Sequence, residues 1–363
     1  MAQIQTLRLH QFRNIRQATL ALAPGLNILT GDNAAGKTSV IEALWVLASG
    51  RSFRSHKPQQ LIQLEQSEMA LYCEVKSETF VHKIGLKRDS KGLELKLNGQ
   101  TQTHQSELAR QLPIQMLTPE SHRLLEEGPK ARRQFLDWGC FYHHPHFIQA
   151  WRTYQRALKQ RNHSLKNQLP TDQVQLWDTA LIESAEQISD LRAAYIQQLK
   201  PFLLEFIGHL MPELNAEIDA KFYCGWPASY DHYQACLSQQ LPRDRQLGHT
   251  QYGSHRADIK FRIQNQEPLI SLSRGQQKLF VCALLLAQAH YLQQQTQNAV
   301  IMLIDDLPAE LDHHHRSTLL SLLDNLGIQH LVTTTSADLI PINEQQNHRI
   351  FKIEQGQVNC LTP

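Results

Sequence analysis

The sequence GDNAAGKT, Gly31 to Thr38, joins a predicted strand, Leu26 to Thr30, to a predicted helix, Thr38 to Ala48. It matches G-x-x-x-x-G-K-[ST], and the flanking strand and helix are the context that makes this motif specific rather than a chance glycine turn. Backbone N–H groups of such a loop cradle a β-phosphate, while Lys37 reaches the β- and γ-phosphates and the Thr38 hydroxyl ligates Mg²⁺. The candidate nucleotide-binding residues are Gly31, Asp32, Asn33, Ala34, Ala35, Gly36, Lys37, Thr38 and the adjacent Ser39.

A second motif lies far along the chain, where the apolar strand Ile301 to Ile304 ends in Asp305 and Asp306. Ligands of open α/β sheets bind at the carboxyl ends of the strands, which is where these acids stand. We expect Asp305 to help hold Mg²⁺ and Asp306 to orient or deprotonate the attacking water. An isolated acidic pair is also typical of a helix N-cap, so this assignment depends on the loop at Gly31.

The composition is that of an ordinary globular protein. The 363 residues predict two or three folding units, and 41% are hydrophobic. The net charge is 36 − 34 = +2, which excludes a polycation, so any affinity for nucleic acid must come from a local patch. No apolar run approaches the about 18 residues of a membrane span, and the amino terminus lacks a secretory pattern, so we expect a cytoplasmic protein without membrane contact.

The pattern along the chain indicates three parts. Short strands precede the glycine loop, and period-two alternation from Glu68 to Leu97 before an Asn98-Gly99 turn predicts an antiparallel sheet. Helical spacing follows from Phe147 to Gln168. In the last third, helices at Phe280 to Leu292 and Ser317 to Leu326 alternate with strands at Asn298 to Ile304 and Gln329 to Thr335, which implies a parallel sheet.

The middle part reads as an antiparallel helical hairpin. Val174, Leu181, Ile188 and Tyr195 recur every seven residues, with Trp177 and Leu191 between them, as in a short coiled coil. Residues 121–170 hold nine Lys or Arg against three acids, and residues 171–220 hold nine acids against two cations. This division favours ion pairs across the hairpin and solvated surface over a patch that tracks phosphates.

Two further segments narrow the class. Leu272-Ser273-Arg274-Gly275-Gln276 resembles the LSxGQ signature of ABC-type ATPases, and Ala309 to Asp312 resembles their D-loop. The resemblance implies that Ser273, Gly275 and Gln276 bind the γ-phosphate of ATP held by the opposite subunit. ATP and Mg²⁺ are then the expected cofactors, and an ATP-dependent homodimer is the expected assembly.

Across nearly its whole length the chain resembles the RecF family of these ATPases. The supporting segments are Phe12-Arg13-Asn14-Ile15, Gly31 to Thr38, Gly50 to Ser55, Thr118 to Glu120, Gly128 to Lys130, Arg132-Arg133, Phe135 to Trp138, Gly253 to Asp258, Ser271 to Lys278 and Ile304 to Asp312. The implied fold is α/β: a P-loop NTPase of the ABC-ATPase head type with an antiparallel-sheet subdomain and an inserted helical arm. The implied division is head 1–120, arm 121–245 and head 246–363.

The resemblance also implies roles for single residues. Gln115 would contact Mg²⁺ and the lytic water, although a polar residue at a strand end is the alternative. Arg13 would close over the nucleotide. Arg51 and Arg54 would lie near a DNA-facing surface, or alternatively cap a helix, and Arg132 and Arg133 would contact DNA.

The chain departs from the family pattern at several positions. Ala34 stands where glycine is usual, which we expect to be tolerated if its φ is negative, and Ser254 stands where proline is frequent. No switch histidine follows the strand at Gln329, so a γ-phosphate sensor would be a threonine, with Thr334 the favoured candidate. Asp306 replaces the glutamate of fast transporters, which predicts slow hydrolysis.

The function implied by the resemblance is an ATP-switched protein that binds duplex or gapped DNA. It would act in DNA replication and recombinational repair, with RecR and RecO in loading RecA onto single-stranded gaps. The alternatives are a transport cassette, the ATPase head of a nuclease complex, or a scaffold that binds ATP without useful hydrolysis. The histidine clusters 143–146 and 313–315 are expected to be exposed loops, because adjacent histidines converge poorly on a metal.

Overall fold

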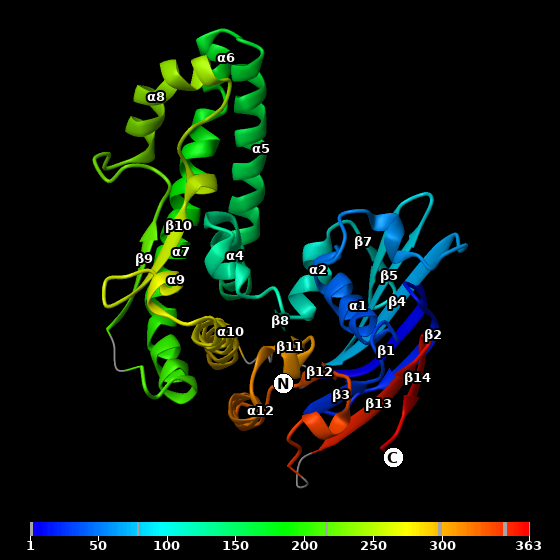
Figure 1. Cartoon of the computed structure of the whole chain (residues 1–363). Helices are drawn as coiled ribbons and strands as arrows, with labels where there is room; N and C mark the ends of the chain where they lie inside the picture. The colour runs from blue at the N-terminus through cyan, green and yellow to red at the C-terminus, as the bar shows by residue number, and fades with distance from the viewer. Residues whose placement is uncertain (1–2, 78–79, 215–216, 297–299, 344–346, 363) are drawn as a thin grey trace. The chain divides into compact units, whose positions relative to one another are not determined.

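Figure 1 shows the chain in a computed structural model, which describes residues 3–77, 80–214, 217–296, 300–343 and 347–362. The chain divides into two compact units. The first comprises Met1–Ser121, Phe206–Met211 and Lys278–Pro363, and the second comprises His122–Glu205 and Pro212–Gln277. The first boundary lies after Ser121, next to the expected start of the arm, but Phe206–Met211 of the expected arm belongs to the first unit. The second boundary falls after residue 277 rather than 245, because residues 246–277 make their contacts within the second unit.

The first unit contains the expected parallel sheet. Its strands are, in spatial order, β14 (Gln357–Cys360), β13 (His348–Glu354), β3 (Leu26–Thr30), β12 (His330–Thr334), β11 (Ile301–Ile304) and β8 (Ile114–Leu117), all parallel except β14. Every residue of β3, β11 and β12 is buried, as expected for a sheet covered on both faces. Asn298, the expected start of β11, lies outside the described residues.

An antiparallel sheet completes the first unit, as the alternating pattern predicts. Its order is β2 (Ile15–Ala21), β1 (Gln3–Phe12), β4 (Glu68–Lys76), β5 (Val81–Asp89), β6 (Leu93–Leu97) and β7 (Gln100–Gln102). Asn98 and Gly99 form the two-residue turn between β6 and β7, both with positive φ, which is the reason for the Asn-Gly pair.

The core of the first unit lies around α1 (Lys37–Ser49). This helix packs against strands of both sheets and is buried on most of its circumference. The other helices of this unit are α2 (Gln105–Gln111), most of α10 (Arg274–Thr296), α11 (Leu307–Glu310) and α12 (His313–Asn325), with 3₁₀ turns at Pro58–Leu61 and Ala337–Leu339. Because most of its surface is buried, α1 holds the glycine loop that precedes it between the two sheets.

The second unit is mainly helical. It contains α3 (Arg123–Glu126), α4 (Pro129–His143), α5 (Phe147–Lys166), α6 (Thr171–Gln175), most of α7 (Asp178–Leu210), α8 (Tyr233–Leu247) and α9 (Pro268–Ser271), with the ladder of β9 (Ile218–Tyr223) and β10 (Asp258–Ile263) and a 3₁₀ turn at Ser254–Arg256. Figure 1 shows α5 and α7 side by side, as the hairpin prediction requires. The heptad residues Val174, Leu181, Ile188 and Tyr195 are fully buried. A break at Leu176 divides the expected second helix into α6 and α7.

Ion pairs tie this unit together. Arg161 of α5 is fully buried and donates to Asp178 of α7 and Asp244 of α8, each at 2.8 Å. Arg192 of α7 forms a bidentate pair with Asp137 of α4. Some of the charged residues of the arm therefore form ion pairs between helices, which is the interpretation that the sequence favoured. Among the described helices, none has the length and apolar character needed to cross a membrane.

Candidate nucleotide-binding site

The glycine loop joins β3 to α1, as predicted, and two of its glycines are sterically required. Gly31 has a φ of 149°, and a Cβ there would lie 2.1 Å from the carbonyl oxygen of Ile353. Gly36 has a φ of 123° and stands directly before the helix, where a Cβ would crowd Asn14. The loop is therefore a tight wrap of backbone that ends at the N-terminus of α1, the arrangement that binds phosphate.

Lys37 turns back onto this loop. Its ammonium group donates to the carbonyl oxygens of Gly31 and Asp32, the latter at 2.8 Å. Partial burial lowers the pKa of Lys37, and this is opposed by Asp306, Asp305 and Asp32. A lysine held at the mouth of the loop in this way is ready to exchange carbonyl oxygens for phosphate oxygens.

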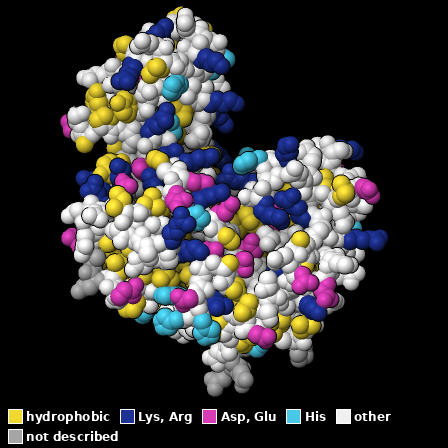
Figure 2. Space-filling view, in the orientation of Figure 1, with side chains coloured by type: hydrophobic (Ala, Val, Ile, Leu, Met, Phe, Trp, Pro, Cys, Tyr) yellow, Lys and Arg dark blue, Asp and Glu magenta, His cyan; other side chains and the backbone are white. Residues whose placement is uncertain are grey.

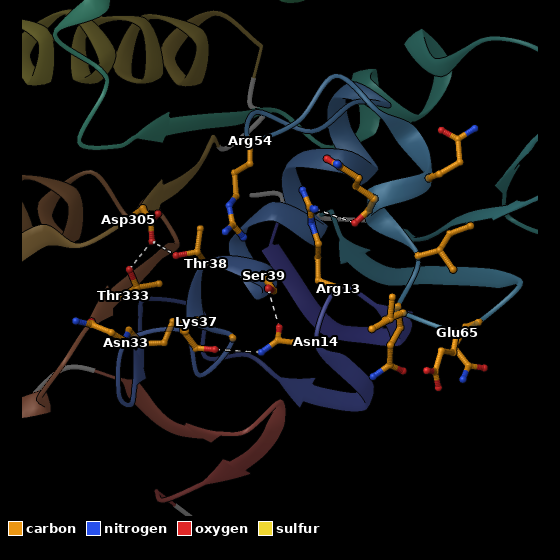
Figure 3. A pocket seen from close by; sticks show the side chains of 18 of the residues that line it. Arg13, Asn14, Asn33, Lys37, Thr38, Ser39, Arg54, Glu65, Asp305 and Thr333 are labelled. Carbon is orange, nitrogen blue, oxygen red and sulfur yellow. Dashed lines mark hydrogen bonds between the residues drawn. The ribbon is translucent and has the colours of Figure 1, made fainter.

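Asp305 is the point at which three elements meet. Its Oδ1 accepts a hydrogen bond from the Thr38 hydroxyl at 3.0 Å and from the Thr333 hydroxyl at 2.7 Å. Figure 3 shows this group beside Lys37 and Asn33. A hydroxyl and a carboxylate are the hard oxygen ligands that Mg²⁺ takes when nucleotide phosphates supply other positions, so Thr38 and Asp305 fit the ion.

Asp306 stands at the rim of the same cleft, exposed, with a φ of 54°. Its backbone N–H donates to the Thr333 hydroxyl at 2.7 Å. The left-handed backbone costs about 1 kcal/mol or more in a non-glycine residue. With this turn of the backbone, Asp306 lines the cleft.

The cleft has a volume of about 1410 Å³ and lies entirely within the first unit. Arg13, Asn14, Asn33, Ala34, Gly36, Lys37, Thr38, Ser39, Arg54, Asp305 and Asp306 line it, with Thr333, Thr335, Pro119 and residues 59–60, 62–67 and 89–90. The structure thus brings together the two motifs, which lie about 270 residues apart in the sequence. Their meeting confirms the spatial relation that the sequence predicts.

Asn14 and Ser39 support the loop from behind. The Asn14 amide donates to the carbonyl oxygens of Ala34 and Ala35, and its oxygen accepts from the Ser39 hydroxyl at 3.0 Å. Ser39 is buried, and its hydroxyl stabilises the loop through this bond to Asn14. The sequence pattern alone assigns no such role to Asn14; its signal is its place beside Arg13 in a strand-to-strand turn.

Ala34 does not have the negative φ on which its tolerance was expected to depend. Its φ is 64°, in the left-handed region where a Cβ is unfavourable. Glycine avoids this cost, which is the physical reason for glycine at this position of the loop. The Ala34 loop therefore carries backbone strain at the nucleotide site.

Gln115 does not lie where a contact with Mg²⁺ and the lytic water requires. It is buried in the middle of β8, and its amide donates to the side-chain oxygen of Gln288 on α10 at 2.7 Å. It is not among the residues that line the cleft. The alternative considered for it was a polar residue at a strand end, whereas Gln115 is the second residue of the four-residue strand β8.

Thr334, the threonine expected to sense the γ-phosphate, does not line the cleft. The Thr334 hydroxyl is buried and donates to the carbonyl oxygen of Ser336, whereas Thr333 and Thr335 line the cleft. Side chains alternate along a strand, so Thr333 and Thr335 share one face and Thr334 takes the other. This alternation is the signal that would have placed Thr333 and Thr335, rather than Thr334, at the cleft.

The signature segment caps a long helix. Ser273 and Gln276 form reciprocal hydrogen bonds at the start of α10, from the Ser273 N–H to Gln276 Oε1 at 3.0 Å and from the Gln276 N–H to Ser273 Oγ at 3.3 Å. Ser273 and Gly275 are exposed, and a Cβ on Gly275 would meet nothing within 4 Å. An open helix N-terminus of this kind suits an anion.

The four arginines assigned to DNA are placed differently from one another. Arg51 is exposed, whereas Arg54 lines the nucleotide cleft. Arg132 is consumed in a bidentate pair with Asp258 at 2.8 and 3.0 Å, and Arg133 donates to the carbonyl oxygen of Ala257 at 2.7 Å. Burial lowers the pKa of Arg133. Arg132 and Arg133 therefore bind the arm together, and the expectation that they face DNA has no support in their contacts.

The histidine clusters are not both exposed loops. His143 ends α4, lies against the Tyr195 ring at a tilted angle and is partly buried, which lowers its pKa to about 4. His313 to His315 open α12, where His315 contacts the N-cap Asp312 at 2.7 Å. In the described part of the chain, no three His, Cys, Asp or Glu side chains are grouped as a metal site.

Comparison with known proteins agrees with this geometry. The model of the family described as "RecF/RecN/SMC N terminal domain" matches residues 3–359. Relatives described as "DNA replication and repair protein RecF" include those of Hydrogenovibrio crunogenus, 56% identical over 358 residues with 99% of both chains covered, and Shewanella frigidimarina, 42% identical over 360 residues with 99% of both chains covered.

Solved structures show the same likeness. The RecF recombination mediator in complex with ATP matches with a TM-score of 0.88 at 25% identity, over 99% of this chain and 98% of that one. An Smc head domain of Pyrococcus furiosus matches in fold, with a TM-score of 0.58 at 15% identity over 99% and 96% of the two chains.

The two sheets around α1, the glycine loop and the acidic strand end define a P-loop ATPase head of the kind shared by RecF and SMC proteins. Within that class, the chain belongs to the RecF family.

Proposed function

We propose that this chain is an ATP-switched DNA-binding protein of replication and recombinational gap repair. ATP closes two heads into a homodimer on duplex or gapped DNA, and slow hydrolysis reopens them. The observation that carries the proposal is the convergence of Lys37, Thr38 and Asp305 in one cleft. The curated relatives' description as replication and repair proteins and the ATP complex of RecF support it.

The dimer follows from the signature segment. Ser273 and Gly275 stand exposed at the N-terminus of α10, and they do not line the cleft that contains Lys37. A γ-phosphate bound in the cleft of one protomer is therefore proposed to meet Ser273 of the other. Each ATP site is then completed only in the dimer, with Mg²⁺ on Thr38 and Asp305 and the base supplied by Asp306.

DNA contact is proposed for one face of α5. Arg156, Lys159 and Lys166 are exposed, and no hydrogen bond or ion pair joins them to a described residue. They lie three and seven residues apart, on one side of a helix without a single Asp or Glu. Figure 2 shows Lys and Arg side chains along the part of the arm that Figure 1 labels α5. Unneutralised cations in a row suit a phosphate backbone.

The remaining parts of the proposal come from the family. RecR and RecO are the proposed partners in loading RecA, since the RecF structures are described as part of the RecFOR pathway. A cytoplasmic location accompanies the DNA substrate. Asp306 is one methylene shorter than glutamate, which is the reason to propose weak hydrolysis, and its stimulation by DNA is proposed from the family resemblance.

The test is ATP hydrolysis measured against protein concentration at saturating ATP, with and without duplex DNA. Specific activity that rises with concentration and rises further with DNA supports composite sites in a DNA-responsive dimer. Specific activity that is flat and indifferent to DNA contradicts the switch and indicates a self-sufficient P-loop enzyme.

The variant Asp306→Asn distinguishes a switch from a scaffold that merely binds ATP. If hydrolysis ends the closed state, the variant should hold DNA for longer in the presence of ATP, as measured by dissociation from a labelled duplex. An unchanged dissociation rate, with hydrolysis abolished, contradicts the proposed reset.

A further inference from the structure

Glu42 is a fully buried carboxylate in the middle of α1, one and a half turns after Lys37. Its side chain has no solvent exposure and does not line the nucleotide cleft. A buried carboxylate is costly unless it is paired and hydrogen-bonded. The groups that pair with it therefore show what this position does.

Arg13 is the first of these groups. Its Nε donates to Glu42 Oε2 at 2.9 Å, and its Nη2 donates to Oε1, a bidentate fork. Nη1 donates to the carbonyl oxygen of Gln60 at 2.8 Å. The Arg13 backbone has a φ of 54° and its N–H donates to the Leu61 carbonyl at 2.9 Å. The guanidinium is thus fixed in direction from several sides while it lines the cleft.

Arg54 is the second group. Its Nη1 lies 3.5 Å from Glu42 Oε2, and its side chain is about half exposed in the cleft. Ser52 adds a link, because its hydroxyl donates to Glu42 Oε1 and accepts the backbone N–H groups of Arg54 and Ser55 at 2.8 and 2.9 Å. The carboxylate thereby fixes both the Arg54 side chain and the loop that carries it.

Two guanidinium groups from different segments therefore converge on one buried carboxylate, and Figure 3 shows Arg13 and Arg54 on the same side of the cleft. The cluster has a net charge of +1, and its carboxylate is withdrawn from the surface. We propose that Glu42 is a positioning residue that holds Arg13 and Arg54 as a preformed binding pair for the polyphosphate of the nucleotide. This inference rests on the proposed function and adds a residue that acts through two others.

The test is a double-mutant cycle on the affinity for a fluorescent N-methylanthraniloyl ATP, measured with the full chain and Mg²⁺. Glu42→Gln keeps the shape and removes the charge that orients the arginines. We expect it to weaken binding several-fold, and Arg13→Ala to weaken binding about tenfold, the value of a charge-assisted hydrogen bond. If Glu42 acts through the arginines, adding Glu42→Gln to Arg13→Ala/Arg54→Ala should produce no further loss.

Ser52→Ala is a second, milder variant that leaves no buried charge unpaired. Its effect on affinity should be present in the wild-type chain and absent from the Arg54→Ala chain. The melting temperature of every variant is measured in parallel. If Glu42 and Ser52 served only folding, their substitution would lower the melting temperature with or without the two arginines, and the losses of nucleotide affinity would simply add.

The outcomes separate the two proposals. If the wild-type chain binds the analogue and Lys37→Ala does not, the nucleotide site stands. With that reference in place, a neutral Glu42→Gln, or losses that simply add to those of Arg13→Ala/Arg54→Ala, overturns the positioning role alone. If the wild-type chain fails to bind the analogue, the proposed function itself is contradicted.

Discussion

At the scale of single residues, the site depends on side chains whose partners are already in place. Lys37 donates hydrogen bonds to the carbonyl oxygens of its own loop, and Asp305 accepts hydrogen bonds from hydroxyl groups of two different elements. Donors held in this way need little rearrangement to meet a phosphate or a metal ion. The consequences of changing one such residue are therefore specific.

Lys37→Ala should abolish ATP-dependent dimers and ATP-dependent DNA binding. It removes a charge-assisted hydrogen bond to phosphate, which corresponds to a loss of about 100-fold in nucleotide affinity. Titration calorimetry and light scattering with ATP measure both effects. Lys87→Ala is the matched control, since that lysine is half exposed and pairs with Glu68 on the antiparallel sheet. Retained dimers in the Lys37 variant would remove the loop from the mechanism.

Ala34→Gly should stabilise the first unit by about 0.5–1 kcal/mol, because glycine adopts the φ of 64° without a Cβ clash. The measurement is urea-induced unfolding of the full chain, followed by a probe in the first unit. Ala35→Gly is the control: Ala35 has no positive φ, so the same change there should destabilise by a similar amount. Equal effects of the two substitutions would contradict the strain at Ala34.

At the scale of elements, the arm separates two kinds of cation. Arg161 is buried in ion pairs and Arg132 is largely buried in one, so both hold helices and strands together, while the exposed face of α5 carries cations without partners in the described structure. The number of charges in a segment cannot distinguish these two kinds of cation, because the distinction depends on which face of the helix each residue occupies. Only the second kind is available to DNA.

Reversal of Arg156, Lys159 and Lys166 to Glu should weaken DNA binding and reduce the slope of log K against log salt by about one for each phosphate that is no longer neutralised. The measurement is fluorescence anisotropy of a labelled duplex over a range of salt concentrations, with ATP present. Reversal of Lys87, Lys91 and Lys96, at least partly exposed on β5, in the turn that follows it and on β6, is the control. An unchanged salt slope in the α5 variant would mean that this face is simply solvated.

A partly buried histidine, His255, should make the arm sensitive to acid. His255 accepts from or donates to the Tyr154 hydroxyl at 2.6 Å, and burial lowers its pKa to about 4. Because the folded-state pKa lies below the unfolded value of 6.5, the unfolded chain binds more protons between these values. The stability that neutral His255 contributes is thus present above pH 6.5 and lost as pH falls towards 4.

Between pH 7 and pH 5 this loss should be about 2 kcal/mol in the free energy of unfolding of the arm, measured by urea titration. His255→Asn should show a smaller dependence on pH than the wild-type chain. His163→Asn, at an exposed position of α5, is the control and should leave the dependence unchanged. Equal pH dependence in the His255 variant and the wild-type chain would contradict this assignment.

At the scale of the whole molecule, the elements of the proposed ATP site lie in different compact units. Lys37, Thr38 and Asp305 belong to the first, and Ser273 belongs to the second. Proposed completion by a second copy makes assembly depend on nucleotide. The proposal therefore predicts a residue whose loss separates ATP binding from dimer formation.

Ser273→Arg should leave ATP bound by a monomer and prevent the dimer, because a long cation replaces the exposed cap that would meet the γ-phosphate. Light scattering with ATP measures the mass, and equilibrium binding measures the affinity. Ser271→Arg, two residues earlier and also exposed, is the control for bulk at this surface. A dimer of unchanged mass in the Ser273 variant would contradict the composite site.

The local sequence determined the elements and the chemistry of the loop. Strand alternation, the Asn98-Gly99 turn and the pattern from Gly31 to Thr38 are short-range signals, because propensity and side-chain period act within a few residues. They predicted both sheets and α1, and they indicated Lys37 and Asp305 as candidate ligands of the nucleotide and of Mg²⁺. The meeting of the two motifs followed from the rule that parallel strands present their carboxyl ends at one edge.

Tertiary structure alone decided which polar side chains face the cleft. Gln115 pairs with Gln288, Arg132 pairs with Asp258, and Glu42 gathers Arg13 and Arg54 from segments far apart in sequence. The φ of Ala34 was likewise set by the wrap of its loop between strand and helix. Each of these pairings depends on the energy of satisfying a buried polar group, and that energy is fixed by neighbours that come together only when the chain folds.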